Sequence, residues 1–238
     1  MTALFDVAAF DVIWLSVRVA AVAVATTLVP AIATGWLLAR WNHPARAFVQ
    51  GAVMLPLVLP PVVTGYLLLI VLGRSRPLGM LWNTLTGGHI AYTTGACVIA
   101  AAVVGFPLMV EAIRLAIAAV DPRLEQVSRS LGRGRFDTFL RVTVPLAAPG
   151  ILAGAVLAWA RALGEFGATI VLAGNIAGQT RTIPLAVYTL LNARDGEAGV
   201  VVLIGISVTF SMAALLMSFR LSARDAQGRP IRARSKTQ

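Results

Sequence analysis

Residues 200–219 read VVVLIGISVTFSMAALLMSF, a run of apolar and small side chains in which no residue is charged. A helix of this length, rising 1.5 Å per residue, is about 30 Å long and matches the hydrocarbon core of a bilayer. Four more segments are long and apolar enough to cross a membrane, at about 12–39, 48–72, 90–110 and 149–172. The sequence therefore predicts an all-α integral membrane protein of about five transmembrane helices.

The composition agrees with this class of protein. Of 238 residues, 58% are hydrophobic and only 13% are charged, whereas soluble domains carry about 25% charged residues. The chain is long enough for several spans but too short for a second large soluble domain. We expect one transmembrane domain over residues 1–219 and a basic tail over residues 220–238, which we expect to be disordered and to face lipid.

The net charge of +10 reflects membrane topology rather than nucleic-acid binding, because the basic residues lie between and beside the apolar runs. If the N-terminus is outside, the inside segments carry fourteen Lys and Arg and the outside loops carry four. Cytoplasmic segments retain such residues. We therefore expect an outside N-terminus, a cytoplasmic C-terminus, contact with anionic lipid and no nucleic-acid partner.

The polar segment 121–132 lies between the third and fourth spans and has the signals of a short helix. Asp121 is a good N-cap, Pro122 fits the first helical position, and Gly132 can take the left-handed conformation after the last turn. Leu124, Val127 and Leu131 share one face, and a second amphipathic stretch, 136–145, leads into the fourth span. Two interpretations are open: a knob that docks on a partner, or a surface helix in the headgroup layer.

This loop resembles the EAA loop of ABC importer permeases, a cytoplasmic coupling helix that docks on the ATPase subunit. The likeness lies in the spacing from Gly132 to Pro145, with Val142 and Val144 before the proline. The Glu-Ala-Ala core is degenerate, since residues 126–128 are Gln, Val and Ser and the glutamate comes one residue earlier. The resemblance implies a type I importer permease bundle, a coupling loop at about 119–145, and coupling residues Asp121, Leu124, Glu125, Gln126, Val127, Ser128, Arg129, Leu131, Gly132 and Pro145.

Two further stretches resemble the molybdate permeases within that family. They are LPLVLPPVVTGYL at 55–67 and ARALGEFGATI at 160–170, the latter followed by GNI at 174–176 and TRTIP at 180–184. The likeness covers about 12–219 and implies a bacterial inner membrane protein without a cofactor, working as a homodimer with two ATPase subunits and a periplasmic or extracellular molybdate-binding protein. Sulfate permeases share RALGEFG, and tungstate has nearly the same shape and charge, so both remain alternative substrates.

Arg161 and Glu165 are four residues apart, which predicts that they share one face of the fourth helix. A charge in the hydrocarbon region costs about 2.5–3.5 kcal/mol, so both should face protein or a water-filled path. They form either a structural ion pair or part of the translocation path. Thr169 belongs to the same candidate path, as do Pro60 and Pro61, which either break the second helix near the dimer axis or only kink it.

Thr180, Arg181 and Thr182 lie in a predicted outside loop, which either contacts the binding protein or re-enters the bundle. The sequence has no Gly-rich phosphate loop, so we expect ATP hydrolysis in a partner and no enzyme activity in this chain. No His, Cys and carboxylate cluster has metal-ligand spacing. A secondary transporter is the remaining rival, but such proteins are usually built from two repeated halves, and five spans do not divide evenly.

Overall fold

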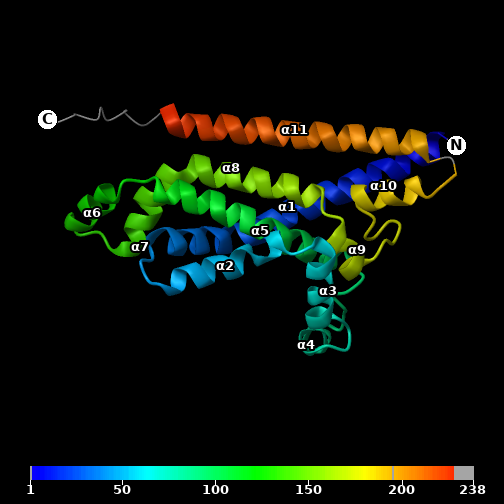
Figure 1. Ribbon diagram of the computed structural model, residues 1–238, viewed down its shortest axis with the longest axis horizontal. Coiled ribbons are helices and arrows are strands. Elements are labelled where there is room, and N and C mark those ends of the chain that lie inside the picture. Colours follow the sequence, from blue (N-terminus) through cyan, green and yellow to red (C-terminus); the bar gives the residue numbers. More distant parts are fainter. Residues whose placement is uncertain (1, 195, 228–238) are drawn as a thin grey trace.

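The computed structural model describes residues 2–194 and 196–227 and is an elongated bundle of helices (Figure 1). Four long helices run along its axis: α1 (Thr2–Arg40), α5 (Thr94–Ala118), α8 (Val144–Leu163) and α11 (Glu197–Gln227). Each contains a segment long and apolar enough to cross a membrane. Helices α2 (Ala45–Val58) and α3 (Pro61–Leu72) form a pair bent by 110° that is apolar enough to be one broken span.

Two hydrogen bonds, one at each end of the bundle, show that the segment between α1 and α5 runs from one end of the bundle to the other. At one end, Nη2 of Arg40 donates to the carbonyl oxygen of Val120 at 3.1 Å. At the other end, the amide of Tyr92 donates to the carbonyl oxygen of Leu172 at 3.1 Å. The segment between them holds α2, α3 and α4 (Pro77–Thr86). Counting the bent pair as one crossing gives five spans, as the sequence predicted.

Small side chains let the central helices pack closely. Helix α5 packs against both α1 and α8, and its Ala96, Ala100 and Ala101 are buried in the core. On α8, a Cβ added at Gly154 would lie 2.8 Å from the Cβ of Ala112 on α5. Membrane helices lack the hydrophobic effect as a driving force between them, so close contact of backbones through small residues is what stabilises their packing.

Of the two alternatives for Pro60 and Pro61, the structure shows the break and not the kink: the second span consists of two helices. Leu59 and Pro60 both have extended backbones, with ψ of 143° and 132°. Each of them precedes a proline, whose ring disfavours the helical conformation in the residue before it. The double proline therefore stops α2 and starts α3 in a new direction, away from the bundle axis (Figure 1).

The fourth span, predicted as continuous over 149–172, is also broken. Helix α8 ends at Leu163, and a separate helix α9 spans Gly167–Ala173. Oε1 of Glu165 accepts a hydrogen bond from the amide of Ala168 at 2.8 Å, which satisfies a backbone donor at the start of α9. Arg161 and Glu165 therefore do not share one helix, because only Arg161 lies on α8.

The remaining elements lie at the two ends of the bundle. Helices α6 (Pro122–Ser130) and α7 (Arg135–Thr138) are followed by a π-helical turn, η1 (Phe139–Thr143), that continues into α8. Helix α10 (Ile183–Leu191) lies at the opposite end, near the start of α1 (Figure 1). Helix α11 continues past Phe219 to Gln227, so the predicted disordered tail does not begin at residue 220; no Gly or Pro interrupts the helix there. Residues 228–238 of that tail lie outside the described part.

Candidate functional site

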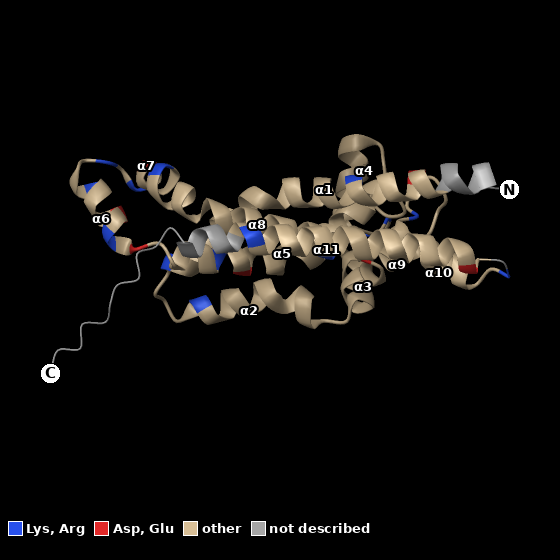
Figure 2. Ribbon diagram, turned by 90° about the horizontal axis from the view of Figure 1, so that it is seen from above, with Lys and Arg blue, Asp and Glu red and all other residues tan. Residues whose placement is uncertain are grey.

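Basic side chains gather at the end of the bundle that carries α6 and α7 (Figure 2). Helix α6 there has the ends that the sequence predicted. Oδ1 of Asp121 accepts from the amide of Arg123 at 2.9 Å, Pro122 is the first helical residue, and Gly132 has a φ of 87°. A side chain at Gly132 would be strained in that conformation, so the glycine ends the helix at low cost.

The outer face of α6 carries an apolar ridge that is largely exposed to solvent. Leu124, Val127 and Leu131 are 48%, 57% and 77% exposed, and Gln126 beside them is exposed as well. The helix is otherwise polar, so the ridge does not belong to the core of this subunit. Exposed apolar side chains at helical spacing, rimmed by polar ones, are typical of a helix that docks in a groove of a partner.

The inner face of α6 is held to the rest of the chain by polar contacts. The hydroxyl oxygens of Ser128 and Thr138 are 3.0 Å apart and buried, which joins α6 to α7. Oε1 of Glu125 receives hydrogen bonds from Nη2 of Arg40 at 2.9 Å and from Oγ1 of Thr143 at 2.8 Å. The sequence predicted that Glu125 and Ser128 belong to the coupling loop, but Arg40 and Thr143 were missed, since no local pattern links them to residue 125.

The two stretches that resemble molybdate permeases meet at a crossing of α3 and α9, here called the α3–α9 crossing. A Cβ added at Gly65 of α3 would lie 2.7 Å from the Cα of Ala168 on α9. One added at Gly167 would lie 2.7 Å from the Cβ of Pro61. Real Cβ atoms do not approach so closely. Both breaks, after Val58 and after Leu163, thus serve to bring two backbones into contact.

The charged pair lies directly beside this crossing. Nη1 of Arg161 is 3.0 Å from Oε2 of Glu165, and the glutamate is only 2% exposed. The other carboxylate oxygen is bound by the amide of Ala168, and Thr169 on the next residue of α9 is buried. The ion pair exists within one chain, and it is placed where the two broken spans touch.

The predicted outside loop is more buried than its polar sequence indicated. Thr180 and Thr182 are buried, and Oγ1 of Thr180 accepts from the amide of Ile176 at 2.9 Å, which closes the loop on itself. For these two residues, burial favours the alternative in which the loop re-enters the bundle over a contact with the binding protein. Arg181 is partly exposed, and its Nε donates to Oδ1 of Asn175 at 2.9 Å. Of the three predicted residues, Arg181 is the one with a partly exposed side chain, so it remains the candidate contact for the binding protein.

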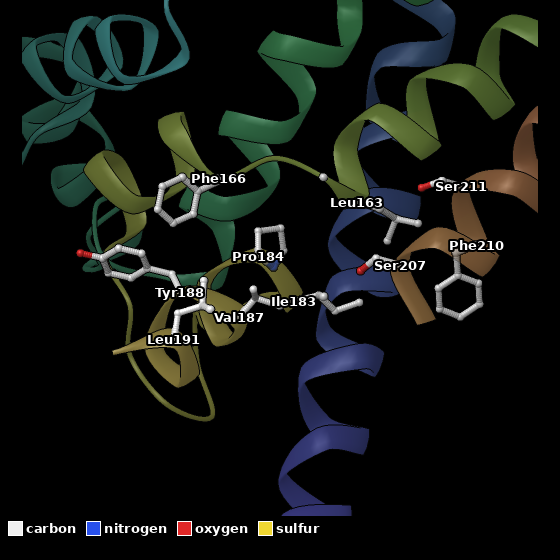
Figure 3. Close-up of a pocket in the computed structure, with 11 residues that line it drawn as sticks. Leu163, Phe166, Ile183, Pro184, Val187, Tyr188, Leu191, Ser207, Phe210 and Ser211 are labelled. Atoms are coloured by element: carbon white, nitrogen blue, oxygen red, sulfur yellow. The ribbon is translucent and has the colours of Figure 1, made fainter. Parts of the chain in front are cut away.

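An apolar cavity of about 340 Å³ lies between the end of α8, α10 and α11. Figure 3 shows Phe166 and Tyr188 on one side of it and Ser207 and Phe210 of α11 on the other. Its walls carry no charged side chain, and their polar side-chain groups are the hydroxyls of Tyr188, Ser207 and Ser211. Within the described residues, no three His, Cys, Asp or Glu side chains come together as metal ligands either.

Comparison with known families identifies the class of protein. Residues 31–225 match the family described as "Binding-protein-dependent transport system inner membrane component". The chain belongs to this family. It is thus a multi-pass inner membrane protein and the permease subunit of an ABC transporter, which works with an ATPase and a solute-binding protein. It is a transport component and not itself an enzyme.

Individual relatives and one solved structure add detail. The chain is 47% identical over 222 residues to the molybdenum transport system permease protein ModB of Escherichia coli K12, covering 92% of this permease and 97% of the relative. ModB of Haemophilus influenzae is 43% identical, with 88% and 92% covered. The permease also resembles the crystal structure of an amino acid ABC transporter with histidines, with a TM-score of 0.60 at 20% identity over 92% and 96% of the two chains. This last likeness supports the fold alone.

Proposed function

We propose that this permease forms the translocation path of an ATP-driven importer of molybdate. The observation that carries the proposal is the α3–α9 crossing, where the two stretches resembling molybdate permeases pack against each other through Gly65 and Gly167. The proposal is also supported by relatives named molybdenum transport system permease proteins, whose sequences are 43–47% identical to this permease. Sulfate and tungstate are the alternative substrates.

The complete importer is proposed to contain two copies of this permease, two ATPase subunits and one external molybdate-binding protein. The apolar ridge of α6, formed by Leu124, Val127 and Leu131, docks on the ATPase in the cytoplasm. With α6 inside, five crossings place the N-terminus outside and the C-terminus in the cytoplasm, which agrees with the excess of Lys and Arg at that end of the bundle (Figure 2). Arg181, at the outside end, is the proposed contact for the binding protein.

Competition in uptake tests the substrate. Proteoliposomes holding the permease, its ATPase and its binding protein are given labelled molybdate with a large excess of sulfate or of tungstate. We expect sulfate to leave uptake unchanged and tungstate to compete. If sulfate competes as well as unlabelled molybdate does, the molybdate assignment fails, while the transport function still stands.

Arg161 and Glu165 are proposed to line or gate the path at the α3–α9 crossing. Replacing Arg161 by Gln is expected to lower uptake about tenfold, because the path loses the positive charge that attracts the anion and Glu165 loses its partner. Uptake is measured in proteoliposomes, with assembly followed by size-exclusion chromatography. Arg18→Gln, which removes an arginine from α1, is the control and should have a small effect. Normal uptake and normal assembly of Arg161→Gln would exclude the path role.

A further inference from the structure

A polar junction joins α6 to two membrane-spanning helices through one carboxylate. Oε1 of Glu125 receives the hydrogen bonds from Arg40, the last residue of α1, and from Thr143, the last residue of the π-helical turn before α8. The guanidinium of Arg40 also donates to the carbonyl oxygen of Val120, just before α6. The side chain of Glu125 thus connects the coupling helix with both α1 and the start of α8.

The junction is largely withdrawn from solvent. The side chains of Arg40 and Glu125 are only 20% and 14% exposed. An ion pair in such surroundings is screened less than a surface pair, and the added bond from the Thr143 hydroxyl satisfies the carboxylate further. Glu125 points inward, whereas the apolar ridge on α6 points outward. Its carboxylate is therefore engaged inside the subunit, and the exposed Gln126 is left to meet a partner.

The covalent connection from α6 to α8 contains a flexible stretch, so it transmits a displacement of α6 poorly. It runs through residues 131–134, which include Gly132, with its positive φ, and Gly134. Glycines make a connection flexible because they restrict the backbone least. After the short helix α7 the chain forms the π-helical turn η1, a form that occurs mostly as short pieces at functional sites. The bond from Thr143 to Glu125 bypasses the glycines and acts directly on the end of that turn.

We propose that Glu125 is a positioning residue of the permease, which ties α6 to α1 and to α8 so that a displacement of α6 moves both helices together. The inference rests on the coupling role proposed for α6. It assigns different tasks to the two faces of this helix: the outer ridge receives the motion of the ATPase, and Glu125 passes it to the membrane bundle.

The test measures coupling in the complete complex of permease, ATPase and binding protein in proteoliposomes. The variants are Glu125→Gln, Arg40→Gln and the double variant. A cavity of about 530 Å³ lined by both polar and apolar side chains borders all three residues of the junction, and glutamine keeps a polar side chain at each changed position, so the variants should fold. Asp137→Asn is the matched control: it removes a carboxylate from the same loop, but its partners Arg133 and Arg141 lie in the neighbouring residues of that loop.

We expect each single variant to lower the molybdate taken up per ATP hydrolysed about tenfold, and the double variant to lower it no further, because the two side chains act as one unit. Asp137→Asn should keep the wild-type ratio. The inference is overturned if the ratio in Glu125→Gln is unchanged, if uptake and hydrolysis fall in parallel, or if the losses in the double variant multiply.

A second readout separates this inference from the proposed substrate. Hydrogen exchange of the backbone amides of α6 needs no transported anion, and it should accelerate in Glu125→Gln but not in Asp137→Asn. If the wild-type complex takes up no molybdate, the proposed function fails. The exchange data still show whether Glu125 holds α6 against α1 and α8. Unchanged exchange in Glu125→Gln would contradict it.

Discussion

Replacing Val127 by Asp is expected to abolish ATP-driven uptake while the permease remains folded. Val127 is 57% exposed at the centre of the apolar ridge on α6, so the substitution disturbs no core packing within this chain. In a docked complex the new carboxylate would be buried in an apolar groove without a partner, which costs several kcal/mol, and each 1.4 kcal/mol weakens association tenfold.

Co-purification of the ATPase with tagged permease measures this effect, together with uptake. Val127→Ile is the control, because it keeps the ridge apolar, and it should bind the ATPase normally. The docking role of the ridge would be refuted if Val127→Asp retained the ATPase and transported at the wild-type rate.

Replacing Gly167 by Ala is expected to destabilise the permease strongly. The added Cβ would lie 2.7 Å from the Cβ of Pro61 and 3.1 Å from the amide nitrogen of Val62, so α3 and α9 must move apart. Overpacking of this kind typically costs about 1–3 kcal/mol. A lower thermal unfolding temperature of the purified subunit in detergent, and lost uptake, should follow.

Two other glycines supply matched controls for this substitution. A Cβ at Gly51 of α2 or at Gly205 of α11 would meet nothing within 4 Å. Ala is favoured over Gly inside a helix by up to about 1 kcal/mol, so these variants should be neutral or slightly more stable. If Gly167→Ala is as stable and as active as Gly205→Ala, close packing at the α3–α9 crossing is not required for stability or for transport.

Features with local signals were predictable from the sequence. The five apolar runs predicted the spans because each run alone is long enough to cross a bilayer. Asp121, Pro122 and Gly132 predicted α6 almost to the residue, since N-caps and left-handed C-terminal glycines act within one turn.

Features that depend on contacts between distant segments were not predictable. Residues 164–166 are Gly, Glu and Phe and include no proline, so the sequence predicts one continuous span, yet the helix ends at Leu163 and Glu165 binds the amide of Ala168 at the start of α9. Arg40 and Glu125 are 85 residues apart, and no spacing rule links them. Thr180 has the sequence of an exposed polar loop, yet it is buried because its hydroxyl closes the loop on Ile176.

The most direct test of the transport function is uptake of molybdate into proteoliposomes from which one component at a time is omitted. We expect accumulation only when the permease, its ATPase, its binding protein and ATP are all present, and none when any one of them is missing. Accumulation that persists without the ATPase and follows a proton gradient would contradict this account and indicate a secondary transporter.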